Sequence, residues 1–313
     1  MNDYAFACDA FSCDADPCRH GVLEAEIARL PESARLLETD RMLVALARAP
    51  QIPELLREIG RLRECAFRAV GEGTGGDLDL DRFDSRYGHL FVWDRERRAL
   101  AGAYRLAATE EFAAHELPHA LYTHTLFDYD REFLAKLGPA IELGRAFVTP
   151  EYQRCSRVLA LLWKGIHGAV ELTGARSLFG AVSVSSSYSR RSRGLVAAAL
   201  LLHHRHLESD GLVRARVPFE LDAADFSAAH ALAEPRELSA QVSALEPDGA
   251  GLPILVKRYL ELGGEFAAWH VDRAFGDSLD GLLVLQMERA DPARVARYSR
   301  SRSSAPRTSS VVS

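Results

Sequence analysis

Two arginines lie where the chain is expected to enter a helix, and their position favours anion binding. Arg154 and Arg157 follow a predicted strand over residues 141–148 and flank the start of a helix near Ser156. The first backbone N–H groups of a helix have no partner within the helix, and the helix dipole makes this end positive. With the two full charges, these groups predict an anion site at residues 153–157.

The preceding strand carries an acidic and a basic side chain three residues apart, Glu142 and Arg145. Successive side chains of a regular strand point to opposite faces, so Glu142 and Arg145 fall on different faces. A bulge in the strand would change this assignment and would allow both charges to join one site. An ion pair of Glu142 with Arg105 or Arg145, which only holds the sheet together, is the alternative to a chemical role.

Other reactive side chains form no recognisable catalytic or metal site. Ser183 and the serines at 185–187 lack the Gly-x-Ser-x-Gly elbow of serine hydrolases. The histidines within residues 203–206 have no following acidic ligand, which favours a solvated helix end. The cysteines and the histidine within residues 8–20 do not have the usual spacing of zinc ligands. We therefore predict no metal site.

Alternating helices and strands are expected to position these residues. Helices are predicted over residues 42–49, 53–70, 158–172, 189–204 and 252–262, and strands over residues 89–93, 100–106, 141–148, 177–183, 264–270 and 279–287. The first two strands flank a charged turn and predict a hairpin. A glycine-rich break at residues 71–76 follows the second helix. This order predicts an α/β or α+β domain with a mixed sheet.

Composition limits the class of protein. Of the 313 residues, 48% are hydrophobic, which is enough to fill a core. The formal net charge of −6 argues against general nucleic-acid binding, which needs a basic field over a whole face. The longest apolar run, residues 195–202, is too short to cross a bilayer. The N-terminus lacks the features of a secretory signal, so we expect a cytoplasmic protein, with contact to a membrane surface left open.

The two ends of the chain differ from its middle. Residues 1–35 show little periodicity, and the last residues are rich in Ser and Arg. We predict a poorly ordered leader over residues 1–35, one domain over residues 36–295 and a disordered tail over residues 296–313.

Six segments carry a family resemblance. They are Glu-Leu-Gly-Arg at 142–145, Leu-Leu-Trp-Lys-Gly-Ile at 161–166, Asp-Arg-Phe-Asp at 81–84, Gly-Ala-Tyr-Arg-Leu at 102–106, Ser-Leu-Phe-Gly-Ala-Val-Ser at 177–183 and Leu-Pro-Ile-Leu-Val-Lys-Arg-Tyr-Leu at 252–260. With these motifs the chain resembles, over about residues 53–290, the bacterial lipid-forming branch of the GNAT superfamily. That branch contains ornithine-acyl carrier protein N-acyltransferases and hemolysin-like acyltransferases, and its fold is similar to that of acyl-homoserine lactone synthases.

The resemblance implies attack of an amine on a thioester, in a GNAT-like fold with helices on both faces of a central mixed sheet. A free α-amine is mostly protonated at neutral pH, so a base must remove a proton, and Glu142 is the candidate base. The developing oxyanion needs a donor. In GNAT-like folds this donor is a main-chain N–H at a distortion of the same strand, which we place around Phe147 and Val148.

Four further side chains are assigned to substrates. Arg145 is expected to orient Glu142 or a substrate carboxylate. Arg105 and Asp84 belong to the segments that carry the resemblance and are assigned to substrate binding. Ser183 lies near a strand end and is expected to hydrogen-bond the pantetheine arm of the acyl donor.

The loop before the helix at residues 158–172 contains no glycine. In the wider GNAT superfamily this loop is glycine-rich and wraps the pyrophosphate of coenzyme A. Side chains limit how closely backbone approaches a diphosphate, whereas arginines can hold the single phosphate of phosphopantetheine. We therefore expect an acyl carrier protein rather than coenzyme A as the donor, with no permanently bound cofactor. The residues assigned to the donor are Gln153, Arg154, Ser156 and Arg157.

The sequence thus predicts an enzyme that moves a long, 3-hydroxylated acyl chain from an acyl carrier protein to the amine of an amino acid such as ornithine. A lysolipid O-acyltransferase and an acyl-homoserine lactone synthase are alternatives, and a non-catalytic module that binds acyl chains or carrier protein is an alternative of another class. Arg190, Arg191 and Arg193 lie beside the expected donor entrance. This run would meet an acidic carrier protein or anionic lipids, or it is simply a solvated face.

Overall fold

The computed structural model describes residues 17–153 and 156–298. The helices are α1 (Pro17–Arg29), α2 (Pro53–Arg68), α3 (Arg131–Leu137), α4 (Pro150–Gln153), α5 (Ser156–Thr173), α6 (Arg190–His203), α7 (Ala223–Ala229), α8 (Pro235–Leu245), α9 (Ile254–Leu262) and α10 (Pro292–Val295). The strands are β1 (Arg35–Glu38), β2 (Met42–Arg48), β3 (Gly88–Asp94), β4 (Ala99–Ala108), β5 (Phe127–Asp128), β6 (Ala140–Val148), β7 (Ser177–Val184), β8 (Arg214–Ala215), β9 (Glu265–Asp272) and β10 (Ser278–Gln286).

Eight of these strands form one mixed sheet in the order β1-β2-β3-β4-β6-β7-β10-β9. Neighbouring strands are antiparallel except for β6 and β7, which are parallel and are connected through α5. Strands β5 and β8 form a separate two-stranded sheet. The prediction of an α/β domain with a mixed sheet is therefore confirmed.

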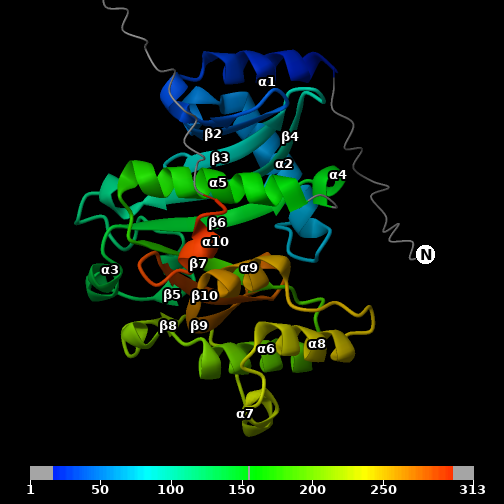
Figure 1. Cartoon of the computed structure of the whole chain (residues 1–313), viewed down its shortest axis with the longest axis vertical. Helices are drawn as coiled ribbons and strands as arrows, with labels where there is room; N and C mark the ends of the chain where they lie inside the picture. Colours follow the sequence, from blue (N-terminus) through cyan, green and yellow to red (C-terminus); the bar gives the residue numbers. More distant parts are fainter. Residues whose placement is uncertain (1–16, 154–155, 299–313) are drawn as a thin grey trace, which may run out of the picture.

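Helices cover both faces of the sheet (Figure 1). On one face, α5 packs across β2, β3 and β4, and α9 covers β10, so that their apolar side chains join one large core cluster. On the other face, α1 and α2 pack on β2 and β3. A third cluster, on the same side, joins α3 and the segment before it to β7 and β10. Figure 1 shows α6, α7 and α8 gathered near the β9 end of the molecule.

The predicted hairpin and the later strands and helices are confirmed, with ends that shift by at most two residues, but the helix predicted over residues 42–49 is wrong. These residues form β2, which pairs along its whole length with β3. Met, Leu and Ala favour helices, and a short apolar run that is buried on both faces has no strand alternation to reveal it. The strand forms because β2 pairs with β1 and β3, and the propensities of its own residues do not reveal this pairing.

The N-terminal part is more regular than its sequence pattern indicates. Helix α1 lies within residues 1–35, where little order is expected, and its Leu23 and Ile27 are buried against α2 and the sheet. The Glu26 carboxylate accepts hydrogen bonds of 2.9 Å from the backbone N–H groups of Glu54 and Leu55, at the start of α2. The carboxylate thus provides an acceptor for two N–H groups at the start of α2 that have no partner within the helix, so α1 belongs to the domain. Residues 1–16 and 299–313 lie outside the described residues.

Strands β6 and β7 separate after three paired residues. The ladder joins residues 140–142 to residues 177–179 and then ends, while β7 continues beside β10 as far as Val184. Gly180 follows the last pair, and a Cβ atom there would lie 2.0 Å from the carbonyl oxygen of Leu143. A side chain cannot fit at this position, so glycine allows the two backbones to approach closely just before they part.

Gly180→Ala should therefore destabilise the fold by about 1–3 kcal/mol, because the methyl group forces β6 and β7 apart. Thermal or urea unfolding of the full chain measures this. Gly144→Ala is the matched control, since a Cβ at Gly144 meets no atom within 4 Å. Equal stability of the two variants would show that the close approach at Gly180 is not a constraint on the sheet.

Candidate active site at the split in the sheet

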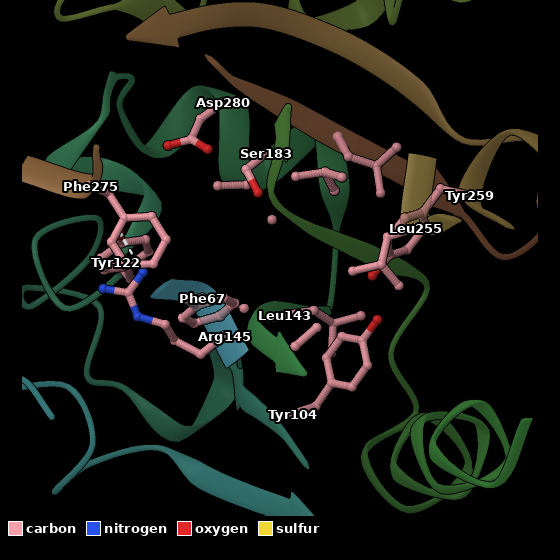
Figure 2. A pocket seen from close by; sticks show the side chains of 16 residues that line it. Phe67, Tyr104, Tyr122, Leu143, Arg145, Ser183, Leu255, Tyr259, Phe275 and Asp280 are labelled. Atoms are coloured by element: carbon pink, nitrogen blue, oxygen red, sulfur yellow. Dashed lines mark hydrogen bonds between the residues drawn. The ribbon is translucent and has the colours of Figure 1, made fainter. Parts of the chain in front are cut away.

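A cavity opens where β6 and β7 separate. Residues 143–146 of β6 and residues 180–183 of β7 form its wall, and side chains from both faces of the sheet complete it. Its empty volume is about 630 Å³, part of it open to solvent. Figure 2 shows the side chains around it. Because the opening passes between two strands, ligands on opposite faces of the sheet can meet there.

The two ends of the cavity differ in chemistry. Charged and hydroxyl-bearing side chains lie together at one end, beside two aromatic rings (Figure 2); they are Arg145, Tyr122, Ser183, Asp280, Phe67 and Phe275. The other end is formed by Tyr104, Leu255, Tyr259 and Leu283, which belong to the core on the α5 and α9 side. The polar end suits a small polar substrate, and the apolar end suits a hydrocarbon chain.

Strand β6 contains a bulge at Arg145 and Ala146, where two residues lie opposite Tyr104 alone of β4. Arg145 has a φ of 49°, a left-handed conformation that is uncommon for residues other than glycine. Phe147 and Val148, around which the sequence places the distortion, pair regularly with β4. The distortion therefore lies about two residues earlier than predicted, and it turns the backbone of Arg145 and Ala146 toward the cavity wall.

The Arg145 side chain is held from several sides. Its Nη1 donates to the hydroxyl of Tyr122 at 3.2 Å, and its Nε lies 3.3 Å from Oδ2 of Asp79. Its Nη2 lies 3.8 Å from Oδ2 of Asp81. The guanidinium also stacks on the rings of Tyr122 and Phe275, 4.8 Å and 4.6 Å from their centroids. These contacts fix a full positive charge at the polar end of the cavity.

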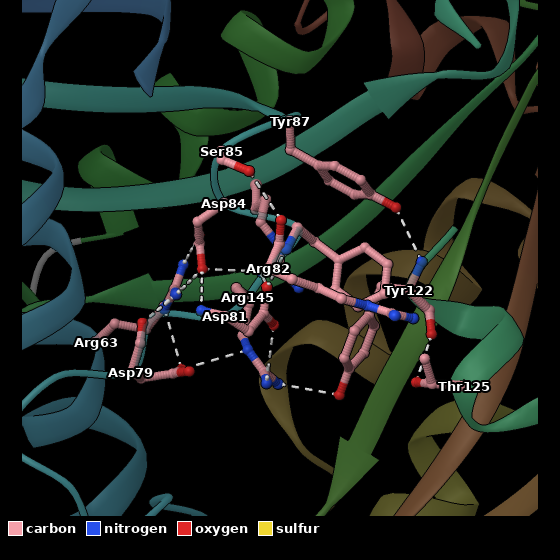
Figure 3. Close-up of polar contacts among 12 residues, drawn as sticks. Arg63, Asp79, Asp81, Arg82, Asp84, Ser85, Tyr87, Tyr122, Thr125 and Arg145 are labelled. Atoms are coloured by element: carbon pink, nitrogen blue, oxygen red, sulfur yellow. Dashed lines mark hydrogen bonds and ion pairs between the residues drawn. The ribbon is translucent and has the colours of Figure 1, made fainter. Parts of the chain in front are cut away.

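A buried network of charges lies behind Arg145 (Figure 3). Asp84 accepts two hydrogen bonds from Arg63, at 3.0 and 3.1 Å, and a third from Arg105 at 3.1 Å. Arg105 also donates to Asp81 at 2.6 Å, and Nε of Arg63 lies 3.0 Å from Asp79. Burial alone would raise the pKa of Asp84, but Arg63 and Arg105 lower it to about 2. Asp84 therefore stays ionised at neutral pH.

The network changes the expectation for Arg105 and Asp84. The sequence assigns both to substrate binding, yet both side chains are almost fully buried and neither lines the cavity. The two residues pair with each other, and Asp84 pairs with Arg63 as well, because a buried ion left without a partner would be strongly destabilising. In this arrangement they support Asp79 and Asp81, which in turn hold Arg145.

Glu142 is also engaged within the protein. Its carboxylate accepts hydrogen bonds from the backbone N–H groups of Tyr122 and Thr123, at 3.0 and 2.6 Å, and one from the Tyr87 hydroxyl. The side chain is 1% exposed and does not line the cavity. Within the described residues it makes no ion pair with Arg105 or Arg145, so that alternative is wrong. Glu142 instead fixes the backbone that carries Tyr122, and a role as base stays a prediction.

Ser183 does line the cavity, as its assignment requires, but its Oγ donates to Oε2 of Glu72 at 2.9 Å. Burial raises the pKa of Glu72 to about 7, against the opposing effects of the Ser183 hydrogen bond and the Arg145 charge. Asp280, on β10, also lines the cavity. Burial, together with the neighbouring Asp272 and Glu72, raises its pKa well above the usual range.

Sequence pattern contains little that indicates these acidic groups. Asp280 carries the single charge in the apolar strand β10. A lone carboxylate in such a strand indicates a functional residue, but periodicity alone does not identify it. Glu72 lies in the glycine-rich break after α2, 111 positions from its partner Ser183. No local pattern brings these two residues together.

The donor loop is described only in part. Gln153 ends α4 and donates from Nε2 to the carbonyl oxygen of Val148 at 3.0 Å. Arg157 is exposed in the first turn of α5. Arg154 and Cys155, and the side chain of Ser156, lie outside the described residues. Arg157 thus places one positive charge at the N-terminal end of a long helix, where an anion would be stabilised.

Neither a metal centre nor a membrane span emerges from residues 17–153 and 156–298. Over these ranges no three His, Cys, Asp or Glu side chains are grouped to hold a metal ion. No helix in them is long and apolar enough to cross a membrane.

Comparison with known proteins agrees with the fold. Residues 62–164 match the family model described as an acetyltransferase (GNAT) domain. A glycine N(alpha)-acyltransferase of Bacteroides thetaiotaomicron is 31% identical over 292 residues, which are 86% of this chain and 85% of that protein. A protein with the same name from Phocaeicola vulgatus is 30% identical over 304 residues, which are 89% of this chain and 90% of that protein.

The fold, the site and the family model define an acyltransferase of the GNAT class. Within this class, the chain belongs to the family of these two bacterial N-acyltransferases. Among solved structures, a CoA-dependent acyl-homoserine lactone synthase, MesI, matches 82% of this chain and 92% of its own with 12% identity and a TM-score of 0.39. A likeness of that size does not indicate a shared substrate.

Glu142→Gln tests whether Glu142 positions Tyr122 or acts as the base. The amide replaces an acceptor oxygen with a donor that faces backbone N–H groups, so we expect a loss of about 1–3 kcal/mol of stability and a lower kcat/KM. The shape of the pH–rate profile should not change, because the proton acceptor remains. Glu132→Gln, on the exposed face of α3, is the control. Unchanged stability combined with loss of the rate increase with pH would instead identify Glu142 as the base.

Proposed function

We propose that the protein transfers a long fatty acyl chain from a phosphopantetheine thioester to the α-amine of a small amino acid, with glycine as the first candidate. The observation that carries this proposal is the fixed guanidinium of Arg145 at the polar end of a cavity whose other end is apolar. An arginine in such a position binds a carboxylate through charge-assisted hydrogen bonds. The two relatives named glycine N(alpha)-acyltransferase support glycine over ornithine.

The split between β6 and β7 provides a path for the donor. Beyond Glu142, the edge of β6 that faces β7 has no strand partner. Its backbone polar groups are available to the amide groups of a pantetheine arm, much as a sheet edge accepts an added strand. The thioester carbonyl would then lie near the bulge at Arg145 and Ala146, where a main-chain N–H can stabilise the oxyanion.

The reaction needs one bond made and one broken at the thioester carbonyl. The neutral amine attacks the carbonyl carbon, a C–N bond forms, and the C–S bond breaks as the thiol leaves. Of the two protons that the original ammonium group loses, one ends on the sulfur and the other is removed by a base. The apolar wall formed by Tyr104, Leu255, Tyr259 and Leu283 would accept the first carbons of the acyl chain and exclude water.

The donor is proposed to be an acyl carrier protein. The loop over residues 153–157 has no glycine to wrap a diphosphate, and Arg157 is exposed for a single phosphate. The run at residues 190–193 has fewer arginines available for docking than the sequence predicts. Arg190 is paired with Asp225, and Arg193 donates to the carbonyl oxygen of Asp277. Only Arg191 in this run is left exposed without such a contact in the described part of the chain, so a docking role there, or contact with anionic lipids, is weakly supported.

Purified full-length protein should form N-acylglycine when incubated with glycine and a long-chain acyl carrier protein thioester. Matched reactions replace the donor with acyl-CoA, or the acceptor with ornithine, a lysophospholipid or S-adenosylmethionine. Mass spectrometry of the products measures each combination. We expect glycine and the carrier thioester to give the highest kcat/KM. A lactone product would indicate a homoserine lactone synthase, an ester would indicate an O-acyltransferase, and the absence of an acylated amine with every acceptor would disprove the proposal.

A further inference from the structure

The polar end of the cavity contains a second set of charges opposite in sign to Arg145. Asp280 on β10 lies directly opposite Ser183 on β7 in the antiparallel ladder, so their side chains share one face of the sheet. The Ser183 hydroxyl then connects to Glu72 at 2.9 Å. Asp280 and Glu72 are 6% and 5% exposed, and they come from segments more than two hundred residues apart.

Burial and neighbouring negative charges increase the proton affinity of these two carboxyls. Burial raises the pKa of both, and the negative charges of Asp272 and Glu72 raise the pKa of Asp280 further. Arg145 opposes the shift for each of them. His270 lies opposite Asp280 on β9, but its Nδ1 accepts a hydrogen bond from the backbone N–H of Val217. Carboxyls that repel each other ionise in separate steps, so the loss of a proton from one increases the proton affinity of the other.

Charges of both signs at one end of a cavity match a zwitterion. An amino acid carries its carboxylate and its ammonium group on the same carbon, and glycine has no side chain beyond them. Figure 2 shows Arg145, Ser183 and Asp280 around the same end of the cavity. Arg145 lines the cavity, and its Nη2 lies 3.8 Å from Oδ2 of Asp81, too far for a hydrogen bond. The cavity therefore offers a donor for the carboxylate and acceptors for the ammonium group.

Accepting the proposed function, we propose that Asp280 binds the ammonium group of the amino acid and takes its proton, and that Glu72, held by Ser183, acts on Asp280 through its negative charge. The ionised Asp280 removes one proton from the ammonium group, and the amine that results attacks the thioester carbonyl. The second proton goes to the departing thiolate as the C–S bond breaks. Asp280 then returns its proton to water, which restores the starting state. This assigns to Asp280 the role of base that the sequence gives to Glu142.

Three variants test the assignment by their pH–rate profiles at saturating donor. Asp280→Asn should lower kcat about 100-fold or more and abolish the rise of the rate with pH, because the proton acceptor is gone. Glu72→Gln should move this rise to lower pH, since it removes a negative charge that holds the proton on Asp280. Ser183→Ala should move it in the same direction but less far, because Glu72 loses the hydrogen bond that favours its ionised form and so carries less negative charge near Asp280. A purely structural role would not give two graded shifts to lower pH.

Glu265→Gln is the matched control, because Glu265 is a partly buried carboxyl on the neighbouring strand β9 whose pKa burial also raises, and it does not line the cavity. It should leave the profile unchanged. An active wild type whose profile is the same in all three variants overturns this inference and leaves the proposed function intact, whereas a wild type without N-acyl product contradicts the proposed function itself. If Asp280→Asn does not fold, the shifts of Glu72→Gln and Ser183→Ala to lower pH decide, and their absence overturns the inference.

Discussion

Three arginines and three aspartates, largely removed from water between α2, β4 and β6, form the interaction on which this site depends. Arg63, Arg105 and Arg145 are balanced in charge by Asp79, Asp81 and Asp84. Removing one member would leave an uncompensated charge in a low-dielectric interior, which costs about 3–5 kcal/mol. The set is therefore constrained as a whole. Its outermost member, Arg145, is the only one of the six that lines the cavity.

The bulge in β6 connects this network to the cavity. A regular strand would alternate its side chains and leave Glu142 and Arg145 on different faces. The positive φ of Arg145 changes the direction of its side chain and brings it against Tyr122. Glu142 holds the backbone of Tyr122 from the other side. Thus both charged residues of one short motif act on the same residue, Arg145 through the Tyr122 hydroxyl and Glu142 through its backbone N–H, and together they shape the polar end.

Much of the fold follows from sequence pattern, while the site depends on contacts that pattern does not contain. The hairpin, β6, α5 and β10 were predictable because their apolar residues repeat with the right period or carry the family resemblance. Strand β2 was not, since its Met, Leu and Ala residues suit a helix equally well. The resemblance indicated Arg145 and Ser183, both of which line the cavity. It could not show that Arg105 and Asp84 lie behind the wall, that Asp280 joins the wall from a distant strand, or that Glu72 contacts Ser183 from behind it.

The proposed function depends most on the binding of the amino-acid carboxylate by Arg145. Its most direct test compares kcat/KM for glycine and for glycinamide, which lacks the negative charge, in the wild type and in Arg145→Gln. Differences in amine basicity cancel when the two ratios are compared. We predict that the preference for glycine falls about 10-fold or more in Arg145→Gln, while Arg190→Gln, an exposed arginine outside the cavity, keeps the wild-type preference. An unchanged preference in Arg145→Gln would show that Arg145 does not bind the carboxylate of the acceptor.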